Sequence, residues 1–237
     1  MKKTICLLCL LGLATLHAQE ENDSSDAPPT PQGSYLTVNI LSPIAFETPR
    51  YRFGYILPLN KKWMVGLDAG YGDQSITFTT IDRIKSEDYR LFEFRTEIYY
   101  ILPVARKSIH YLSLEVGYLN HQETFFDDFF KSGPSDTKIA YDSADYERIR
   151  GAITLKYGAF YELWEQIGLN VYYGIGVRQR DNSYLNIVES GISQSDESPS
   201  VDDDRNEYGF FNDYYRREGK HIGLNLQLGF KLYYQFK

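Results

Sequence analysis

Ionisable side chains recur at every second position inside otherwise apolar segments of this 237-residue chain. Arg95 and Glu97, for example, are separated by Thr96 and flanked by Phe94 and Ile98. If such residues share one enclosed face, opposite charges must pair, because an unpaired charge removed from water costs several kcal/mol. The sequence therefore predicts an internal charge network. Its predicted members are Arg52, Asp68, Glu93, Arg95, Glu97, Glu115, Arg150, Lys156, Arg178 and Lys231.

Histidines are the other candidates for proton transfer near neutral pH. His121 follows Glu115 at even spacing on the polar face, and His221 opens the last alternating segment. A serine beside either one would indicate a hydrolase, but the sequence has no His-x-Ser or Gly-x-Ser-x-Gly pattern. It also shows no metal-ligand spacing. We therefore expect no enzymatic activity, no catalytic residue, no metal site and no cofactor.

Two long acidic stretches, residues 119–146 and 181–220, carry paired aromatic residues. The pairs are Phe125-Phe126, Phe129-Phe130, Phe210-Phe211 and Tyr214-Tyr215. If these stretches are loops, they present aromatic rings in polar surroundings, which is typical of a surface that binds a ligand. Alternatively, the flanking strands project further and the rings pack against one another. Both interpretations stay open at this point.

The amino-terminal segment has the pattern of a secretory signal peptide over residues 1–18, with Lys2 and Lys3 before an apolar run. Residues 19–33 form an acidic, Pro-rich leader with few large apolar side chains, which predicts disorder. We expect one domain over residues 34–237. The formal net charge of −7 argues against nucleic-acid binding.

The segments that carry the charged residues alternate with a period of two. In the last segment Leu224, Leu226 and Leu228 share one face and small or polar residues occupy the other, as in a strand. The predicted strands are 35–41, 50–58, 63–72, 89–102, 108–118, 147–161, 167–180 and 221–236. Short and long connections alternate between them. The pattern predicts an all-β fold, an eight-stranded antiparallel up-and-down barrel.

Alternation alone fits a barrel with apolar side chains facing lipid, and also a soluble secreted lipocalin-like barrel that encloses an apolar cavity. The mixed charges and frequent glycines of the polar face favour a narrow, enclosed lumen. Aromatic residues near the strand ends match the girdles of transmembrane barrels. The predicted girdle residues are Trp63, Tyr71, Tyr100, Tyr118, Tyr161, Tyr234 and Phe236. Two roles follow for the charges, a gate that passes small ions or a structural plug, and the narrow lumen of eight strands favours the plug.

The chain resembles small outer-membrane β-barrels of the OmpA transmembrane-domain and OmpX type. The resemblance is carried by the eight segments, the signal peptide and the ending Leu232-Tyr233-Tyr234-Gln235-Phe236, which Lys237 follows. The segment from Thr48 to Tyr55 is also similar to uncharacterised barrels of Bacteroidetes-like bacteria. The resemblance implies a monomer in the outer membrane of a Gram-negative bacterium, with both termini in the periplasm. Its expected partners are outer-membrane lipid, lipopolysaccharide and the barrel assembly machinery.

We therefore expect a non-enzymatic barrel whose plugged lumen anchors acidic, aromatic-rich extracellular loops. Such a protein would contribute to envelope integrity or surface recognition. Two alternatives stay open, namely an outer-membrane lipid-modifying enzyme with His121 or His221 at the rim, and the soluble ligand-binding barrel.

Overall fold

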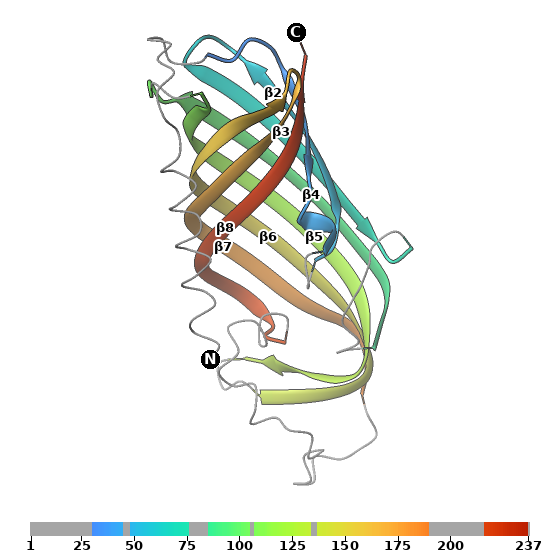
Figure 1. Ribbon diagram of the computed structural model, residues 1–237. Coiled ribbons are helices and arrows are strands. Elements are labelled where there is room, and N and C mark those ends of the chain that lie inside the picture. The colour runs from blue at the N-terminus through green and yellow to red at the C-terminus, as the bar shows by residue number, and fades with distance from the viewer. Residues whose placement is uncertain are drawn as a thin grey trace, which may run out of the picture.

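The protein folds into one closed barrel of eight antiparallel strands, each paired with its neighbours in chain order and β1 paired with β8 (Figure 1). The computed structural model describes residues 30–44, 48–75, 85–104, 107–133, 137–189 and 216–236. The elements are β1 (Tyr35–Asn39), η1 (Ser42–Ile44), β2 (Tyr51–Pro58), β3 (Trp63–Asp73), β4 (Lys85–Ile101), β5 (Ile109–Ser132), β6 (Thr137–Trp164), β7 (Ile167–Glu189) and β8 (Gly219–Gln235). The predicted fold class and strand count are confirmed. The expected signal peptide and most of the leader lie outside the described residues.

The strands are staggered by ten residues around the barrel. Tyr35 of β1 pairs directly with Gln235 of β8. Following the register partners of Tyr35 in the other direction around the barrel, from β2 to β8, leads to Asn225, which lies ten residues before Gln235. The paired residues along that path are Tyr35, Ile56, Gly66, Glu97, Glu115, Thr154, Gly176 and Asn225. With a rise of about 3.3 Å per residue and strands about 4.8 Å apart, this stagger corresponds to a tilt of about 41°.

The two ends of the barrel differ. The short connections β2–β3, β4–β5 and β6–β7 lie at the end where β1 begins and β8 finishes, which we call the terminal end. At the opposite, distal end, β4 to β7 project well beyond β1 to β3 (Figure 1). β1 stops early because the Asn39 side chain accepts hydrogen bonds from the backbone N–H groups of Leu41 and Ser42, which turns the chain into η1.

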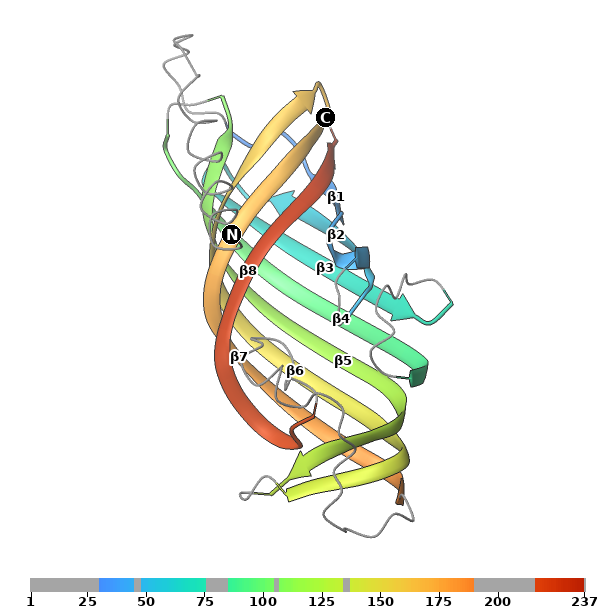
Figure 2. The same cartoon turned by 60° about the horizontal axis from the view of Figure 1, so that its bottom comes forward.

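The prediction of a loop over residues 119–146 is wrong. Most of this stretch continues β5 and β6 as a hairpin, paired from Leu119↔Arg150 to Ser132↔Thr137. Most of its outward residues are polar, so the apolar alternation on which the strand boundaries relied ends there although the backbone pairing does not. Asp127 has a φ of 54°, and the register between β6 and β7 shifts near Ser143. The hairpin bends there, and its tip curls across the distal end of the barrel (Figure 2). β7 likewise runs on to Glu189.

The faces of the strands have the predicted orientation. Leu224, Leu226 and Leu228 point outward and are 57%, 64% and 64% exposed, whereas Arg95 and Glu97 point inward and are 6% and 3% exposed. The described strands thus do not enclose an apolar cavity of the lipocalin-like kind. No helix among the described residues has the length and apolar character of a membrane span.

All seven predicted girdle residues lie on the outer face of the barrel. Tyr71 and Tyr118 lie at the distal edge of the apolar part of that face, and the other five lie near the terminal end. The Trp63 and Tyr100 rings lie 5.0 Å apart, and the Tyr234 and Phe236 rings 5.1 Å apart. Five of the seven side chains are 40–50% exposed, and Tyr100 and Tyr161 are half-buried.

Aromatic rings fill the lumen at the terminal end. The members of this terminal cluster are Tyr35, Ile56, Met64, Tyr99, Ile101, Tyr111, Phe160, Tyr172 and Tyr233. Glycine on the neighbouring strand makes room for Tyr172: a Cβ atom at Gly229, its register partner, would lie 2.2 Å from the Tyr172 ring. The sequence pattern did not single out these inward rings, because they occupy the face identified by its charged and small residues.

Candidate functional site: a charge network inside the barrel

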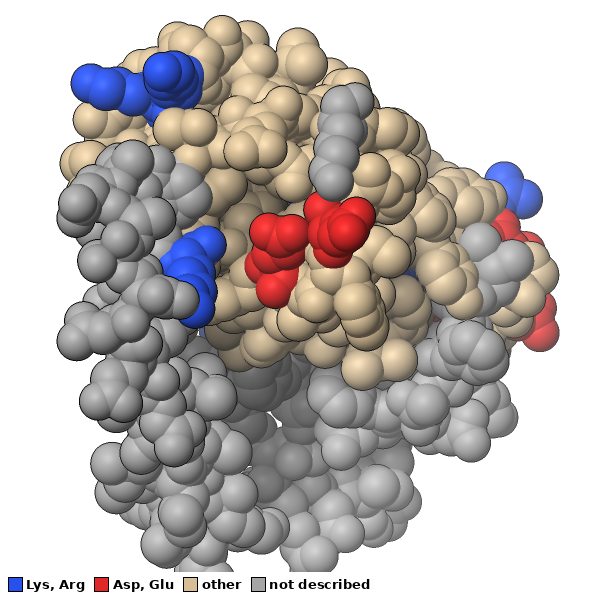
Figure 3. Space-filling view, turned by 45° about the horizontal axis from the view of Figure 1, so that its top comes forward, with Lys and Arg blue, Asp and Glu red and all other residues tan. Residues whose placement is uncertain are grey.

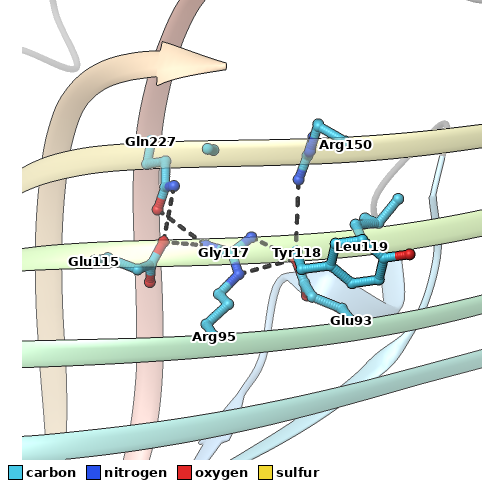
Figure 4. A pocket seen from close by; sticks show the side chains of 9 residues that line it. Glu93, Arg95, Glu115, Gly117, Tyr118, Leu119, Arg150 and Gln227 are labelled. Carbon is cyan, nitrogen blue, oxygen red and sulfur yellow. Dashed lines mark hydrogen bonds and ion pairs between the residues drawn. The ribbon is translucent and has the colours of Figure 1, made fainter. Parts of the chain in front are cut away.

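The predicted charges meet in the middle of the lumen, just distal to the terminal cluster. Arg95 extends from β4 between two carboxylates, with its guanidinium 2.6 Å from Glu93 Oε1 and 2.6 Å from Glu115 Oε1 (Figure 4). Glu93 is the most shared anion. It accepts from Arg50 Nε at 2.6 Å, and the Arg52 and Arg150 guanidiniums lie 3.5 and 3.8 Å away.

Two lysines neutralise the remaining carboxylates. Lys156 Nζ donates to Glu97 Oε2 at 3.0 Å and also to Glu115 Oε2. Lys231 Nζ donates to both oxygens of Asp68, at 3.0 and 2.7 Å. The Tyr172 ring lies between the lysines, with its centroid 4.5 Å from Lys156 Nζ and 5.7 Å from Lys231 Nζ.

Neutral polar groups complete the hydrogen bonding of the carboxylates. The Ser113 hydroxyl donates to Glu97 at 2.5 Å, and the Tyr99 hydroxyl donates to the same carboxylate at 2.9 Å. Gln227 bridges the network, since its Nε2 donates to Glu115 and its Oε1 accepts from Arg95 (Figure 4). A buried ion pair is stabilising only when its remaining lone pairs and protons are also satisfied. This network meets that condition at its carboxylates.

The network leaves little free space. Its ion-paired side chains are at most 8% exposed, except Arg150 at 18%. The cavity lined by Glu93, Arg95, Glu115, Arg150 and Gln227 has a volume of about 10 Å³, room for about one water molecule. The described side chains of the network therefore fill this level of the lumen.

Three of the buried carboxylates, Asp68, Glu97 and Glu115, lie close enough together that one oxygen from each is within 4.8 Å of the others. Such a cluster has the donor atoms of a metal site. Here, however, each carboxylate already accepts from a lysine ammonium of the network. The structure therefore gives these acids an ion-paired role.

Eight of the ten predicted network residues are joined directly, and Arg150 lies at the edge of the network. Arg178 points into the lumen beside Gly223, farther toward the distal end. Arg50 is a member that the prediction missed. It has the same parity as Arg52 and lies within the predicted strand 50–58, but it was not included among the predicted network residues; in the structure it lies one residue before β2.

The two histidines lie beyond the network. His121 is 3% exposed, and its ring packs against Tyr89 and Tyr146 at centroid distances of 5.0 and 5.6 Å. Its Nε2 lies 3.1 Å from Glu123 Oε2, and burial lowers the pKa of His121 to about 4. The His221 Nε2 lies 3.0 Å from the Glu218 carbonyl oxygen. Within the described residues, neither histidine is hydrogen-bonded to a serine hydroxyl.

A second aromatic cluster seals the distal hairpin. Its members are Phe125, Phe130, Tyr141, Ala144, Tyr146 and Tyr184. Phe130 stacks on Tyr184 with centroids 4.2 Å apart. Phe125 and Phe130 therefore pack against neighbouring rings, which was the second interpretation of the paired aromatic residues. Phe126 and Phe129 are only half-buried. The pairs at 210–211 and 214–215 lie outside the described residues.

Residues 216–218, which we call the strap, tie the start of β8 to the tip of the hairpin. The backbone N–H of Lys131 donates to the Arg216 carbonyl at 2.7 Å, and Glu218 N–H donates to the Lys131 carbonyl at 3.0 Å. The Arg216 guanidinium lies 2.9 Å from Asp128 and 4.4 Å from the centre of the Phe129 ring. These contacts hold the bent hairpin across the distal end.

No protein-family model matches this chain, and no curated protein is significantly similar to it. The architecture and the charge network therefore carry the functional argument.

Proposed function

We propose that this protein is a non-enzymatic, membrane-spanning barrel of the outer membrane of a Gram-negative bacterium, of the OmpA transmembrane-domain or OmpX type. Its plugged lumen is a rigid anchor for the distal hairpin, which faces the outside of the cell. The protein contributes to envelope integrity or to recognition at the cell surface.

The observation that carries this proposal is a continuous apolar belt on the outer face with a defined edge. Apart from Thr96 and His110, the outward side chains of the strands are apolar from the terminal end up to Tyr71, Phe92, Tyr118, Ile149, Val177 and Ile222. Just distal to this edge, at or near the next outward position of each strand, the outward residues are polar and form a row. This polar row consists of Asp73, Arg90, Gln122, Glu147, Asp181 and Lys220, most of them register neighbours.

An apolar surface that encircles a protein is costly in water and favourable in lipid. The belt contains some of the most exposed apolar side chains of the barrel, such as Ile222 at 77% and Tyr173 at 61%. Seen from the terminal end, the described surface is mostly uncharged, with a few separate charged groups (Figure 3). The interior supports the same orientation, because charges enclosed by the strands are paired and kept away from lipid.

Surface recognition is favoured by the part of the molecule beyond the polar row. On the outer side of β7, Leu185 and Val188 are 51% and 54% exposed although they lie outside the belt. Apolar side chains in polar surroundings are typical of binding surfaces. This region overlaps the two stretches, 119–146 and 181–220, in which we expect a surface ligand.

Membrane fractionation combined with gel mobility tests the proposal. The protein should be recovered with outer membranes and should migrate differently before and after boiling, because a folded barrel resists detergent unfolding. Trp63 offers a direct probe of how deeply the belt lies in the bilayer, since it lies in the belt and is 42% exposed. Brominated acyl chains should quench its fluorescence. Recovery of the folded protein in buffer without detergent would contradict the proposal.

The plug is tested separately by planar-bilayer recording. We expect no steady current from the folded protein, because the network leaves only a water-sized cavity. The expected signal peptide is tested by amino-terminal sequencing of the exported protein, which should begin at residue 19.

A further inference from the structure

β8 has an unpaired edge along its distal half. β1 pairs with β8 only as far as Asn39↔Lys231, because the Asn39 side chain turns the chain into η1. On its other side β8 is paired with β7 as far as Asn182↔Gly219. Distal to Lys231, therefore, no described strand lies along the edge of β8 that faces away from β7, and β1 lies beside β8 only near the carboxyl terminus (Figure 2).

The hydrogen bonds between β1 and β8 show which backbone groups lie on this edge. The Phe236 N–H donates to the Ser34 carbonyl oxygen, and the Ile40 N–H donates to the Phe230 carbonyl oxygen. In an antiparallel ladder the N–H and C=O groups of one residue face the same neighbour, so the even-numbered residues of β8 face the β1 side. Four such residues follow distally, and their N–H and C=O groups have no partner on that side among the described residues. We call them the seam edge: Ile222, Leu224, Leu226 and Leu228.

The exposure of the side chains along β8 also indicates a missing neighbour. Leu232 and Tyr234, which lie beside β1, are 41% and 40% exposed. The side chains of the seam edge are 57–77% exposed. All six point outward from the same strand, so the difference follows from the presence or absence of a strand on the second side.

An unpaired edge at this level of the barrel calls for an added strand. The seam edge lies within the apolar belt, which ends on β8 at Ile222. Under the proposed function lipid surrounds this part of β8, and lipid offers no hydrogen-bond partner to backbone N–H and C=O groups. An open edge is also a template for pairing with another extended segment. The segment that fits would continue the line of β1.

A second copy of the chain does not fit the seam edge. Antiparallel pairing of two seam edges requires a two-fold axis perpendicular to the barrel wall, which would invert one barrel relative to the other. A two-fold axis along the membrane normal would instead make the two tilted strands cross. Copies inserted in one orientation therefore cannot pair through this edge, an argument that rests on the proposed function.

The segments of this chain outside the described ranges also lack the required pattern. A strand beside the seam edge must be apolar at every second residue, on its lipid side. The apolar residues within 76–84 do not keep one parity, and residues 19–29 and 190–215 are rich in acidic side chains. Residues 45–47 are too few to span the seven positions from Ile222 to Leu228.

We propose that the seam edge binds an extended segment of another protein, which pairs antiparallel with β8 and completes the barrel wall distal to β1. The segment has apolar side chains at every second position, directed toward lipid. Its other side chains are small or polar, because on the inner face they lie beside Gly223, Asn225 and Gln227. The partner is thus defined by its extended backbone and by this alternation.

A peptide that copies residues 171–179 of β7 is the probe, since this segment already pairs with residues 222–230 of β8. One form carries N-methyl groups at positions 172, 174 and 176, and its isomer carries them at positions 173, 175 and 177. Only the first form keeps the N–H groups that face the seam edge when its apolar side chains point outward. Fluorescence anisotropy of the labelled peptides is measured with the folded protein in non-ionic detergent.

We expect saturable binding of the first form with one peptide per barrel, and about a hundredfold weaker binding of the isomer, which has lost three hydrogen bonds. The two isomers have the same composition and the same side chains. Equal binding of both, or no saturable binding of the first form, would overturn the proposal.

Leu226→Pro removes one N–H group from the seam edge and none from the ladder with β7, because even-numbered residues face away from β7. It should weaken binding of the first peptide by about tenfold. Leu226→Ala is the matched control, which shortens the same side chain but keeps the N–H group, and it should bind almost like the wild type. An equal loss in both variants would assign binding to the side chain and contradict strand addition. The comparison of the peptide isomers needs no variant, so it applies even if Leu226→Pro does not fold.

A photocrosslinking amino acid in place of Leu224 identifies the occupant in cells. We expect an adduct with a segment of another protein that shows the stated alternation. An adduct with a second copy or with another segment of this chain would overturn the proposal, and so would the absence of any protein adduct. Peptide binding in detergent does not require a bilayer, so membrane fractionation separates a failure of the proposed function from a failure of this inference.

Discussion

Side chains alternate between the outer and the inner face along β6, but the apolar face and the polar face are exchanged between the two ends of the strand. Within the belt, Ile153 and Leu155 point outward and are 56% and 54% exposed, and Lys156 points inward at 1%. Beyond the polar row, Tyr146 points inward at 1% exposure and its neighbour Glu147 points outward. One strand is therefore apolar outside and ionic inside over part of its length, and polar outside and aromatic inside over the rest.

Under the proposed function, the inversion follows from the surroundings of the outer face, with lipid around the belt and water around the hairpin. A hairpin in water must bury apolar side chains between its own strands. A belt in lipid needs no apolar core for that purpose, so its lumen can hold paired charges beside the terminal cluster. Substitutions in the two regions test this difference.

Removal of a cation from the charge network should lower the free energy of unfolding more than any other substitution considered. Lys156→Met leaves Glu97 and Glu115 buried without their shared ammonium. Breaking a buried pair on one side costs about 3–5 kcal/mol. We expect a loss of this size in the free energy of unfolding, measured by urea titration of the reconstituted barrel. Lys61→Met, in the exposed β2–β3 turn, is the control and should leave stability unchanged. A loss below 1 kcal/mol for Lys156→Met would show that the network does not hold the barrel together.

Truncation of the distal cluster should affect only the hairpin. Phe130→Ala removes a ring that is 2% exposed and stacked on Tyr184, a change that typically costs about 3 kcal/mol. We expect faster proteolysis within residues 119–146 while the barrel keeps its heat-modifiable mobility. Phe129→Ala, at a half-buried ring of the same hairpin, should have a smaller effect. Joint loss of hairpin and barrel would mean that the two regions form one cooperative unit.

Arginine scanning of the outer face should locate the edge of the belt. Leu226→Arg places a charge on the apolar belt, which in lipid costs about 2–4 kcal/mol near the bilayer centre. Gln122→Arg places the same charge in the polar row and should cost almost nothing. Urea unfolding in bilayers measures both. Equal costs at the two positions would contradict the proposed membrane position.

Acidification should loosen the hairpin before the barrel. His121 lies beyond the belt, and its pKa is lowered to about 4, so the unfolded state binds more protons than the folded state between about pH 4 and 6.5. Its contribution to stability is complete above that interval and falls on acidification, by about 1 kcal/mol at pH 5.5. Amide hydrogen exchange of residues 119–146 should accelerate accordingly. His121→Phe should remove this pH dependence, and an unchanged profile would assign it to other groups.

Much of the charge network could be predicted because parity along a strand is a local property. Arg95, Glu97 and Lys156 were assigned to the interior from their spacing alone. The partners could not be predicted, since the contact of Lys156 with Glu97 joins residues that are 59 positions apart. The continuation of β5 past Tyr118 was missed because its next outward residues, Asn120, Gln122 and Thr124, are polar, so the apolar alternation ends although the strand pairing continues.

The sequence by itself determined the period of two, the number of strands and the face on which each charge lies, because these depend only on neighbouring residues. The tertiary structure decided which charges pair, how far the strands extend and which rings close the lumen. Those features depend on the ten-residue stagger of the closed register. That stagger brings distant residues to one level of the barrel, and no local pattern encodes it.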